Sequence, residues 1–363
     1  MTPLEEHLKR RIALDGPLTI ADFMAEALGH PQFGYYRTRD PLGAAGDFTT
    51  APEISQVFGE LIGLWLAEMW RLHGMSTGVR LVELGPGRGT LMADLLRAAS
   101  RMPGFLDAVS VHMVETSPAL RNEQGKALAP HPNVAWHDSL AEVPEGQLLL
   151  VANEFLDALP IHQLVRTETG WREKLVVWDD GADRPAFGLS PGASPVETLL
   201  AEEIRSGADI GAVAEVSPAS LSVTAEIARR LQTGIAALII DYGYRNSAVG
   251  DTLQAVKAHD YAPVLVNIGE ADLTAHVDFG AIGRAAAGAG AAVHGPVTQR
   301  DFMIDLGALH RRDALLTRAT PQQAKAIKSG VQRLIDPKEM GTLFKVMAFT
   351  ASGGTAIDPP PGF

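Results

Sequence analysis

The sequence lacks cysteine, long apolar runs and the apolar core of a secretion signal. Without cysteine, the chain of 363 residues forms no disulfide, zinc-thiolate site, iron-sulfur cluster or thiol nucleophile. Its most apolar stretches, residues 148–151 and 235–240, are far shorter than the ~20 residues that span a bilayer, so they predict buried strands. These absences lead us to expect a cytoplasmic protein with no membrane span.

Basic residues are also in deficit. The chain has 31 lysines and arginines against 43 aspartates and glutamates, which gives a formal net charge of -12. This excess of negative charge repels polyphosphates, so we expect no nucleic-acid partner. A small molecule or a cationic protein segment is the better match. Apolar residues make up 46% and charged residues 20% of the chain, which indicates an ordinary globular protein.

Short apolar runs alternate with helical segments from residue 79 onward, a pattern typical of a parallel sheet with crossover helices. The expected class is therefore α/β, with a Rossmann-like sheet in a domain that covers residues 76–363. Seven strands are predicted, at residues 79–83, 109–115, 134–135, 148–152, 237–241, 291–294 and 344–349.

Two further regions accompany this sheet. Residues 1–75 are predicted to form a helical region, with short helices at 4–14 and 19–28 and a long helix from Pro52 to about His73. Residues 163–233 are predicted to form an insertion. It begins with a β-hairpin of residues 163–166 and 172–178 and continues as a loop-rich segment with Pro185, Pro191 and Pro195.

A glycine loop follows the first predicted strand, which ends at Glu83. Gly85, Gly87 and Gly89 come next, and a helix is predicted from Thr90. Glycines let the backbone approach a ligand closely, and the helix N-terminus directs amide groups at it. In the dinucleotide fingerprint the third glycine comes three residues after the second, whereas here it comes two residues after. This spacing favours S-adenosylmethionine over NAD, although glycine turns also occur for packing alone.

Polar residues end the second and third predicted strands. Glu115 lies where a carboxylate can accept hydrogen bonds from both ribose hydroxyls of a nucleoside. Asp138 and Ser139 close the short third strand, where an acid can accept a hydrogen bond from an adenine amino group. Strand-end acids that face water are the alternative interpretation.

The fourth predicted strand runs into Asn153, Glu154 and Asp157, at the edge where an acceptor would meet the methyl group. Solvation of a loop explains one polar residue there more easily than all three together. Asn153 also fits a cap of the following turn.

Six segments of the sequence resemble, in order, those of the MidA family. They are residues 46–60, the loop from Glu83 to Thr90, residues 152–163, 240–243, 250–256 and 269–279. Together they extend over nearly the whole chain. The resemblance implies a class I S-adenosylmethionine-dependent methyltransferase fold, S-adenosylmethionine as methyl donor and a protein arginine as acceptor. Mitochondrial members are protein arginine methyltransferases that act in assembly of respiratory complex I, and a bacterial relative without a transit peptide can have another substrate.

An arginine acceptor requires carboxylates, because its guanidinium is cationic and has delocalised lone pairs. Glu154 and Asp157 are the first candidates to hold two of its nitrogens, with Asp241 and Asp278 in reserve. His276 is the candidate to accept the departing proton, with Asp278 close in sequence. A structural turn explains His276 and Asp278 equally well. No metal site is expected, because no ligand spacing recurs.

Other interpretations stay open. Residues 46–50 resemble a lid over the cofactor, with Gly43 and Gly46 as hinges. A small-molecule methyltransferase on the same fold is the second hypothesis. An assembly factor that binds S-adenosylmethionine for stability and acts by docking is the third, and a dehydrogenase is a distant fourth. The sequence does not determine the oligomeric state.

Overall fold

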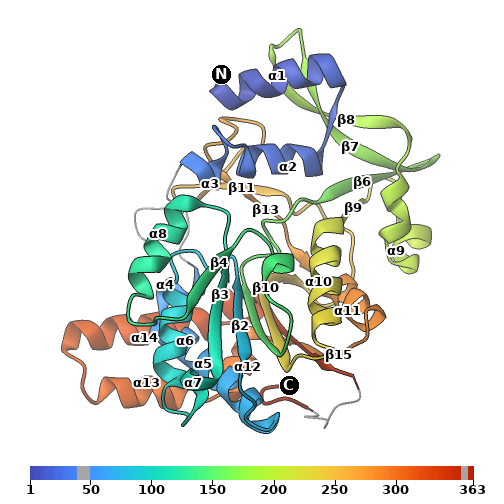
Figure 1. Ribbon diagram of the computed structural model, residues 1–363. Helices are drawn as coiled ribbons and strands as arrows, with labels where there is room; N and C mark the ends of the chain where they lie inside the picture. The colour runs from blue at the N-terminus through green and yellow to red at the C-terminus, as the bar shows by residue number, and fades with distance from the viewer. Residues whose placement is uncertain (39–49, 353–358) are drawn as a thin grey trace. The chain divides into compact units, whose positions relative to one another are not determined.

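The computed structural model describes residues 1–38, 50–352 and 359–363 (Figure 1). The chain divides into two compact units, each assembled from separate segments. Unit 1 contains residues 1–38, 157–222 and 246–281, and unit 2 contains the other described residues. The N-terminal helices and the insertion therefore share a unit, whereas the sequence pattern divides the chain at residue 75.

Unit 2 is built on a twisted sheet whose continuous path contains seven strands in the order β15-β16-β10-β5-β2-β3-β4. Six of these strands point in the same direction, and β16 is antiparallel to both of its neighbours. The bounds are β2 Val79–Leu84, β3 Val109–Val114, β4 Val134–His137, β5 Leu148–Asn153, β10 Ala236–Tyr244, β15 Ala291–Thr298 and β16 Phe344–Ala351. The predicted class and the seven predicted strands are confirmed, with most strands one to four residues longer than expected.

Helices accompany the sheet of unit 2. Their bounds are α4 Ala51–Ile54, α5 Gln56–Leu72, α6 Thr90–Ala99, α7 Phe105–Ala108, α8 Pro118–Ala127, α12 Gln299–Asp305, α13 Ala308–Leu316, α14 Pro321–Ile335 and α15 Met340–Leu343, with a 3-10 turn at Leu140–Glu142. The predicted long helix from Pro52 is wrong in one respect. Ser55 has an extended backbone (φ -157°, ψ 128°) and its side chain caps Val57, so α4 ends there and α5 begins anew.

Close packing of α5 against α6 fixes the helix that follows the glycine loop. A Cβ atom on Gly63 would lie 2.4 Å from the carbonyl oxygen of Leu95, and one on Gly59 would lie 2.7 Å from Cβ of Asp94. The two backbones therefore approach at a distance that only glycine permits. The surrounding core includes the fully buried Trp65.

Unit 1 contains two small sheets. One has the order β1-β7-β6-β9 with β8 added to β7, and the other has the order β12-β11-β13. Their bounds are β1 Leu18–Thr19, β6 His162–Thr167, β7 Gly170–Asp179, β8 Arg184–Ala193, β9 Val213–Val216, β11 Gln254–Lys257, β12 Asp260–Ala262 and β13 Asp272–Thr274. A short strand, β14 Val277–Asp278, belongs to neither of these two sheets. The predicted hairpin is confirmed as β6 and β7.

The expectation that the rest of the insertion is loop-rich is wrong for β8. This ten-residue strand contains Pro185 and Pro191, and it pairs only with β7. An edge strand tolerates proline because its outer side needs no backbone donor.

The helices of unit 1 are α1 Pro3–Asp15, α2 Ile20–Gly29, α3 Tyr35–Thr38 and α9 Glu202–Gly207, with a 3-10 turn at Pro195–Leu199. Two more helices, α10 Pro218–Arg230 and α11 Phe279–Gly288, begin with residues of unit 1 and end with residues of unit 2. Within the described ranges, no helix combines the length and the apolar character that crossing a membrane requires.

Candidate active site at the carboxyl edge of the sheet

Parallel pairing brings the carboxyl ends of β5, β2 and β3 to one edge. Leu84 pairs with Val114 of β3 on one side and with Ala152 of β5 on the other. The residues that follow these three positions therefore emerge side by side. Most of the predicted site residues of unit 2 lie in this group.

The glycine loop needs glycine for its backbone conformation. Gly85, Gly87 and Gly89 have φ angles of 62°, 54° and 83°, all in the left-handed region. A Cβ on Gly85 would also lie 2.8 Å from Cδ2 of Phe155, in the loop after β5. The glycine loop therefore packs closely against the loop after β5, and its backbone conformation also allows a ligand to approach closely.

Gln124 of α8 connects the glycine loop to the residues of β4 and to the end of β3 through hydrogen bonds. The sequence analysis did not predict this role. Its amide nitrogen donates to the carbonyl of Gly87 at 2.7 Å and to Glu115 at 3.4 Å, while its amide oxygen accepts from Trp136 at 2.8 Å. It is fully buried. A glutamine within an amphipathic helix carries no signal for such a role.

Glu115 is half-buried directly after β3. One carboxylate oxygen accepts from the backbone of Ser117 at 2.7 Å, and the other faces Gln124. Burial raises the pKa of Glu115, and these hydrogen bonds together with Arg121 oppose that rise. Glu115 is thereby held in place at the position predicted for ribose binding.

Asp138 and Ser139 are both exposed after β4. A carboxylate oxygen of Asp138 accepts from Arg121 at 2.6 Å, and Arg121 also donates to the carbonyl of Glu115 at 2.7 Å. Arg121 therefore joins the ends of β3 and β4. The adenine-binding role of Asp138 and Ser139 stays a prediction.

Two buried oxygen atoms at this edge have no hydrogen-bond partner among the described residues: Oε2 of Glu83 and Oδ1 of Asn153. Glu83 pairs with Val151, two residues before Asn153, so both side chains lie on the same face of neighbouring strands. Burial raises the pKa of Glu83 well above its usual value. A buried polar atom without a partner is costly and calls for a donor.

S-adenosylmethionine fits these acceptors, because it carries an ammonium group, a cationic sulfur and ribose hydroxyls. Glu83 and Asn153 would hold donors of the methionine part, Glu115 would hold the ribose, and the backbone of the glycine loop would allow close approach. When bound, this cofactor supplies a methyl group on a cationic sulfur.

Glu154 follows β5 in a strained conformation, with a φ angle of 50° that residues other than glycine rarely adopt. Its Oε1 accepts from the backbone of Ala51 at 2.9 Å and from the Asn153 amide at 3.0 Å. Its own backbone nitrogen donates to Ile240 at 2.9 Å. The neighbours thus impose both the backbone and the carboxylate position of Glu154.

Asp241 holds the loop that contains Glu154. Its carboxylate accepts backbone hydrogen bonds from Phe155 at 3.2 Å, Leu156 at 3.0 Å and Tyr242 at 2.9 Å, and the residue is only 1% exposed. These contacts make Asp241 a positioning residue for the loop after β5. Sequence reasoning kept it only as a reserve carboxylate for the substrate.

Asp157 and His276 belong to unit 1, unlike Glu154. Asp157 is buried, and its carbonyl accepts from the backbone of Ala275 at 3.0 Å. Tyr36 is half-buried and donates to Asp272 at 2.9 Å. Burial raises the pKa of Tyr36 well above its usual value, and the charges of Asp272 and Asp157 add to the rise.

His276 is half-buried, and its backbone nitrogen donates to the Thr252 hydroxyl at 2.9 Å. The Asp278 carboxylate accepts from the backbone of Ala281 at 2.8 Å in the first turn of α11. This contact is that of a helix cap. The catalytic roles of Asp157 and His276 stay predictions, and the predicted lid at residues 46–50 lies almost entirely outside the described residues.

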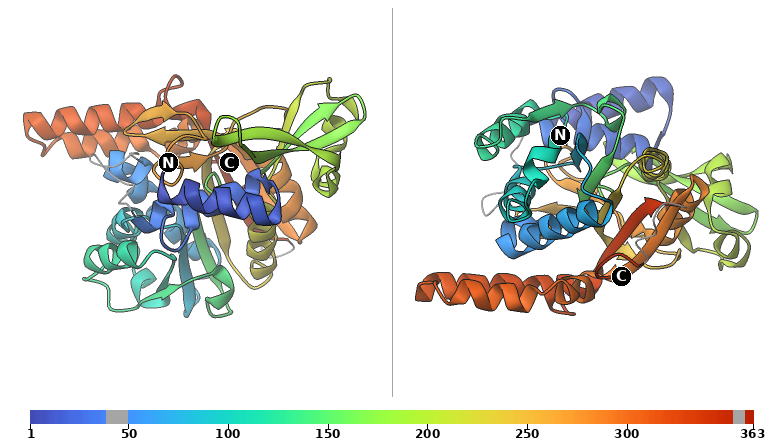
Figure 2. Two further views of the ribbon diagram at one scale, coloured as in Figure 1. Left: turned by 90° about the horizontal axis from the view of Figure 1, so that it is seen from above. Right: turned by 60° about the horizontal axis from the view of Figure 1, so that its bottom comes forward.

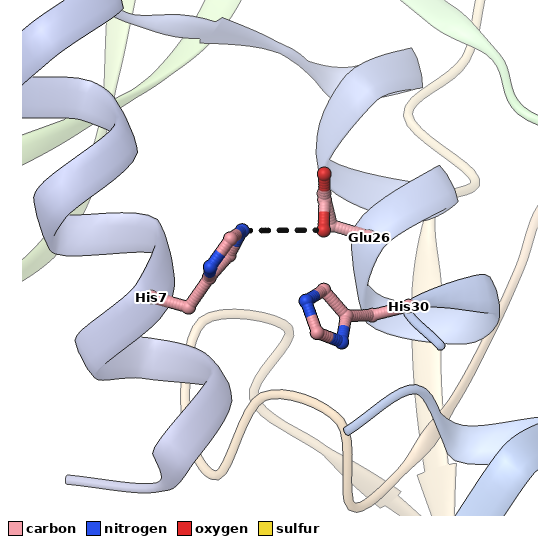
Figure 3. Close-up of side chains that lie close together, drawn as sticks. All are labelled: His7, Glu26 and His30. Carbon is pink, nitrogen blue, oxygen red and sulfur yellow. Dashed lines mark ion pairs between the residues drawn. The ribbon is translucent and has the colours of Figure 1, made fainter. Parts of the chain in front are cut away.

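One cluster with metal-ligating side chains occurs in the described part of unit 1, where His7, Glu26 and His30 converge from α1 and α2 (Figure 3). Two of its candidate ligand atoms already accept hydrogen bonds. Glu26 pairs with Arg11 at 2.6 Å, and Nδ1 of His30 accepts two backbone hydrogen bonds at 3.2 Å from the turn that follows. The cluster therefore serves as a contact between two helices.

The sheet order, the glycine loop and the carboxylates at adjoining strand ends together define an S-adenosylmethionine-dependent methyltransferase of class I. The model of a family described as "Putative S-adenosyl-L-methionine-dependent methyltransferase" matches residues 61–297. The chain belongs to this family, the MidA family.

Similar proteins extend over nearly the whole chain. Protein arginine methyltransferase NDUFAF7, mitochondrial, of Mus musculus is 40% identical over 96% of this chain and 84% of its own length. The homologue from Drosophila melanogaster is 39% identical over 95% of this chain and 84% of its own. A crystal structure of a protein from Burkholderia thailandensis bound to S-adenosyl-homocysteine superposes with a TM-score of 0.83 at 30% identity, over 98% of this chain and 93% of that one.

We predict that S-adenosylmethionine binding releases a proton from Glu83. Burial raises the pKa of this carboxyl in the free protein, and a cationic ligand favours its ionised form, so affinity should rise with pH up to the raised pKa. Calorimetry in two buffers of different ionisation enthalpy, over a pH series, measures the release. Glu83→Gln should abolish it, whereas Glu68→Gln, at a surface ion pair on α5, should not. Equal heats in both buffers for the wild type would contradict the assignment.

We also predict that Asp241→Asn loosens the loop after β5. The amide retains one acceptor and places a donor against backbone N–H groups, so the free energy of unfolding should fall by about 1–3 kcal/mol. Hydrogen exchange at the amides of Phe155 and Leu156 should accelerate. Asp179→Asn is the control, because Asp179 accepts from two backbone amides in an exposed turn of unit 1. Unchanged protection of both amides in Asp241→Asn would show that Asp241 does not hold the loop.

Proposed function

We propose that this chain transfers a methyl group from S-adenosylmethionine to a guanidinium nitrogen of an arginine in a protein. One observation carries the proposal: the carboxylate of Glu154 is fixed in place, on a strained backbone, at the same edge of the sheet as the glycine loop. The relatives named protein arginine methyltransferases support it, since they align with nearly the whole chain.

Each of three residues has a separate role in this reaction. Glu154 holds the guanidinium through charge-assisted hydrogen bonds and leaves one nitrogen directed at the methyl group. Asp157 is the second proposed carboxylate. His276 accepts the proton that the guanidinium loses, because an imidazole titrates near neutral pH.

The acceptor is proposed to be an arginine in an accessible protein segment. The net charge of -12 supports a cationic segment and disfavours nucleic acid. The cytoplasmic location stays a prediction from the sequence.

The test uses an extract of cells that lack this gene, in which the acceptor accumulates unmethylated. Purified protein and S-adenosylmethionine labelled in the methyl group are added, and the protein and small-molecule fractions are hydrolysed and separated. We expect label in methylarginine. Glu154→Gln should lower the rate about 100-fold or more, because it removes a fixed charge that faces the reacting group. Glu123→Gln, at an exposed ion pair with Lys126, is the matched control and should leave the rate unchanged.

The other outcomes identify the alternatives. Label confined to the small-molecule fraction would indicate a small-molecule methyltransferase. Cofactor binding without any transfer would favour a docking factor that binds S-adenosylmethionine for stability. Both results would overturn the proposed acceptor.

A further inference from the structure

Helices α13 and α14 form an antiparallel pair that reaches outward from the sheet of unit 2 (Figure 1, Figure 2). We call residues 308–335 the arm. Its longer helix, α14, has 15 residues and is therefore about 22 Å long. Thr320 and Gln323 form a capping box at its start, and Pro321 occupies the first turn, so the arm has a well-defined tip.

An ion-pair network fixes the base of α13. Arg311 donates to both carboxylate oxygens of Glu60 on α5, at 2.6 Å and 2.9 Å, and Arg97 of α6 pairs with the same carboxylate. The side chain of Glu60 is only 3% exposed. Burial raises the pKa of Glu60, and the hydrogen bonds from the two arginines outweigh that effect and lower it. Glu60 thus stays ionised and anchors the arm to the helices beside the glycine loop.

The base of α14 is fixed by backbone contacts. Gln299 donates to the carbonyl of Leu334 at 2.9 Å, and Arg300 donates to that of Ile335 at 2.8 Å. A Cβ on Gly330 would lie 2.7 Å from the carbonyl oxygen of Ile54, so α14 and α4 are in close contact. The arm is therefore held rigidly at its base while its outer part is exposed to solvent.

The arm is basic in an acidic chain. It contains six lysines and arginines and one aspartate, although the whole chain has a net charge of -12. Four of the six, all exposed, form no ion pair or hydrogen bond with any residue that the structure describes: Arg318, Lys325, Lys328 and Arg333. Lys325 and Lys328 are three residues apart and lie on one face of α14.

One of these cations, Lys328, also lines a hollow between the two helices. The hollow is lined by Arg312, Asp313, Leu316, Lys328, Ser329 and Gln332. Leu316 offers an apolar contact, and the rest of the lining is polar, with the cation of Lys328 and the ion pair of Arg312 and Asp313. Such a surface can receive an apolar side chain that is flanked by carboxylates.

We propose that the arm docks an acidic surface patch of the protein that this enzyme methylates, an inference that rests on the proposed function. Charge complementarity supports it, because four cations without acidic partners face solvent on a rigid support. A long polyanion is a poorer occupant. Nucleic acid or an anionic membrane would extend past an arm of about 22 Å and meet the acidic remainder of the chain. The arm therefore recruits the acceptor by charges distant from the arginine that is methylated.

The binding test uses a fluorescein-labelled peptide of twelve residues, rich in aspartate and glutamate with one central leucine, and the full chain. Fluorescence anisotropy should show saturable binding that weakens as salt rises. Lys325→Gln/Lys328→Gln should weaken binding about tenfold. Lys126→Gln/Lys257→Gln removes the same charge at ion-paired surface positions and should change affinity less than twofold.

The second measurement uses the methylation assay with the same variants. The arm variant should lower kcat/KM for the protein acceptor by a similar factor and leave the affinity for S-adenosylmethionine unchanged. Equal effects of the two double variants on peptide binding would overturn the docking surface. Tighter binding of a 20-base-pair DNA or of vesicles containing phosphatidylglycerol would overturn the choice of partner, as would a change of oligomeric state in the arm variant.

The two proposals fail separately. Peptide binding is measured without cofactor, so the docking surface stands if label never enters arginine. If methylarginine forms and the arm variant keeps the wild-type kcat/KM for the protein acceptor, the proposed function stands. The arm then has no part in recruiting the acceptor.

Discussion

The site depends on the parallel register of β5, β2 and β3. Because Leu84 pairs with both Val114 and Ala152, the glycine loop, Glu115 and the Asn153-Glu154 pair all emerge at one edge. A shift of any strand by one residue would move its polar end to the opposite face. Strand β5 is buried throughout and apolar up to Asn153, and β2 is buried except at Arg80, which stabilises this register.

Two features at this edge are energetically unfavourable for the folded protein alone. The edge retains a buried carboxyl at Glu83 with no hydrogen-bond partner for Oε2 among the described residues, and a strained backbone at Glu154. Both features are unfavourable in the protein alone, and both suit a site that a cationic cofactor and a cationic acceptor complete. Gln124 and Asp241 supply the fixed hydrogen bonds that hold the surrounding loops in place.

Much of this architecture could be predicted from the sequence, because it follows from local patterns. Apolar runs predicted the seven strands, and the spacing of Gly85, Gly87 and Gly89 predicted the cofactor loop. Features that depend on tertiary contacts could not be predicted. The helix break at Ser55 leaves the helical apolar pattern intact, and β8 is a strand despite two prolines because only one side of it is paired. Gln124 and Asp241 act through hydrogen bonds to other elements of unit 2, which no local pattern indicates.

The central claim is that the glycine loop and Glu115 form an S-adenosylmethionine site, and calorimetric titration with S-adenosylmethionine and with NAD tests it most directly. We expect saturable binding of S-adenosylmethionine alone, weakened in Glu115→Ala because the ribose hydroxyls lose their acceptor. Binding of NAD in its place, or an affinity for S-adenosylmethionine that Glu115→Ala leaves unchanged, would contradict the account.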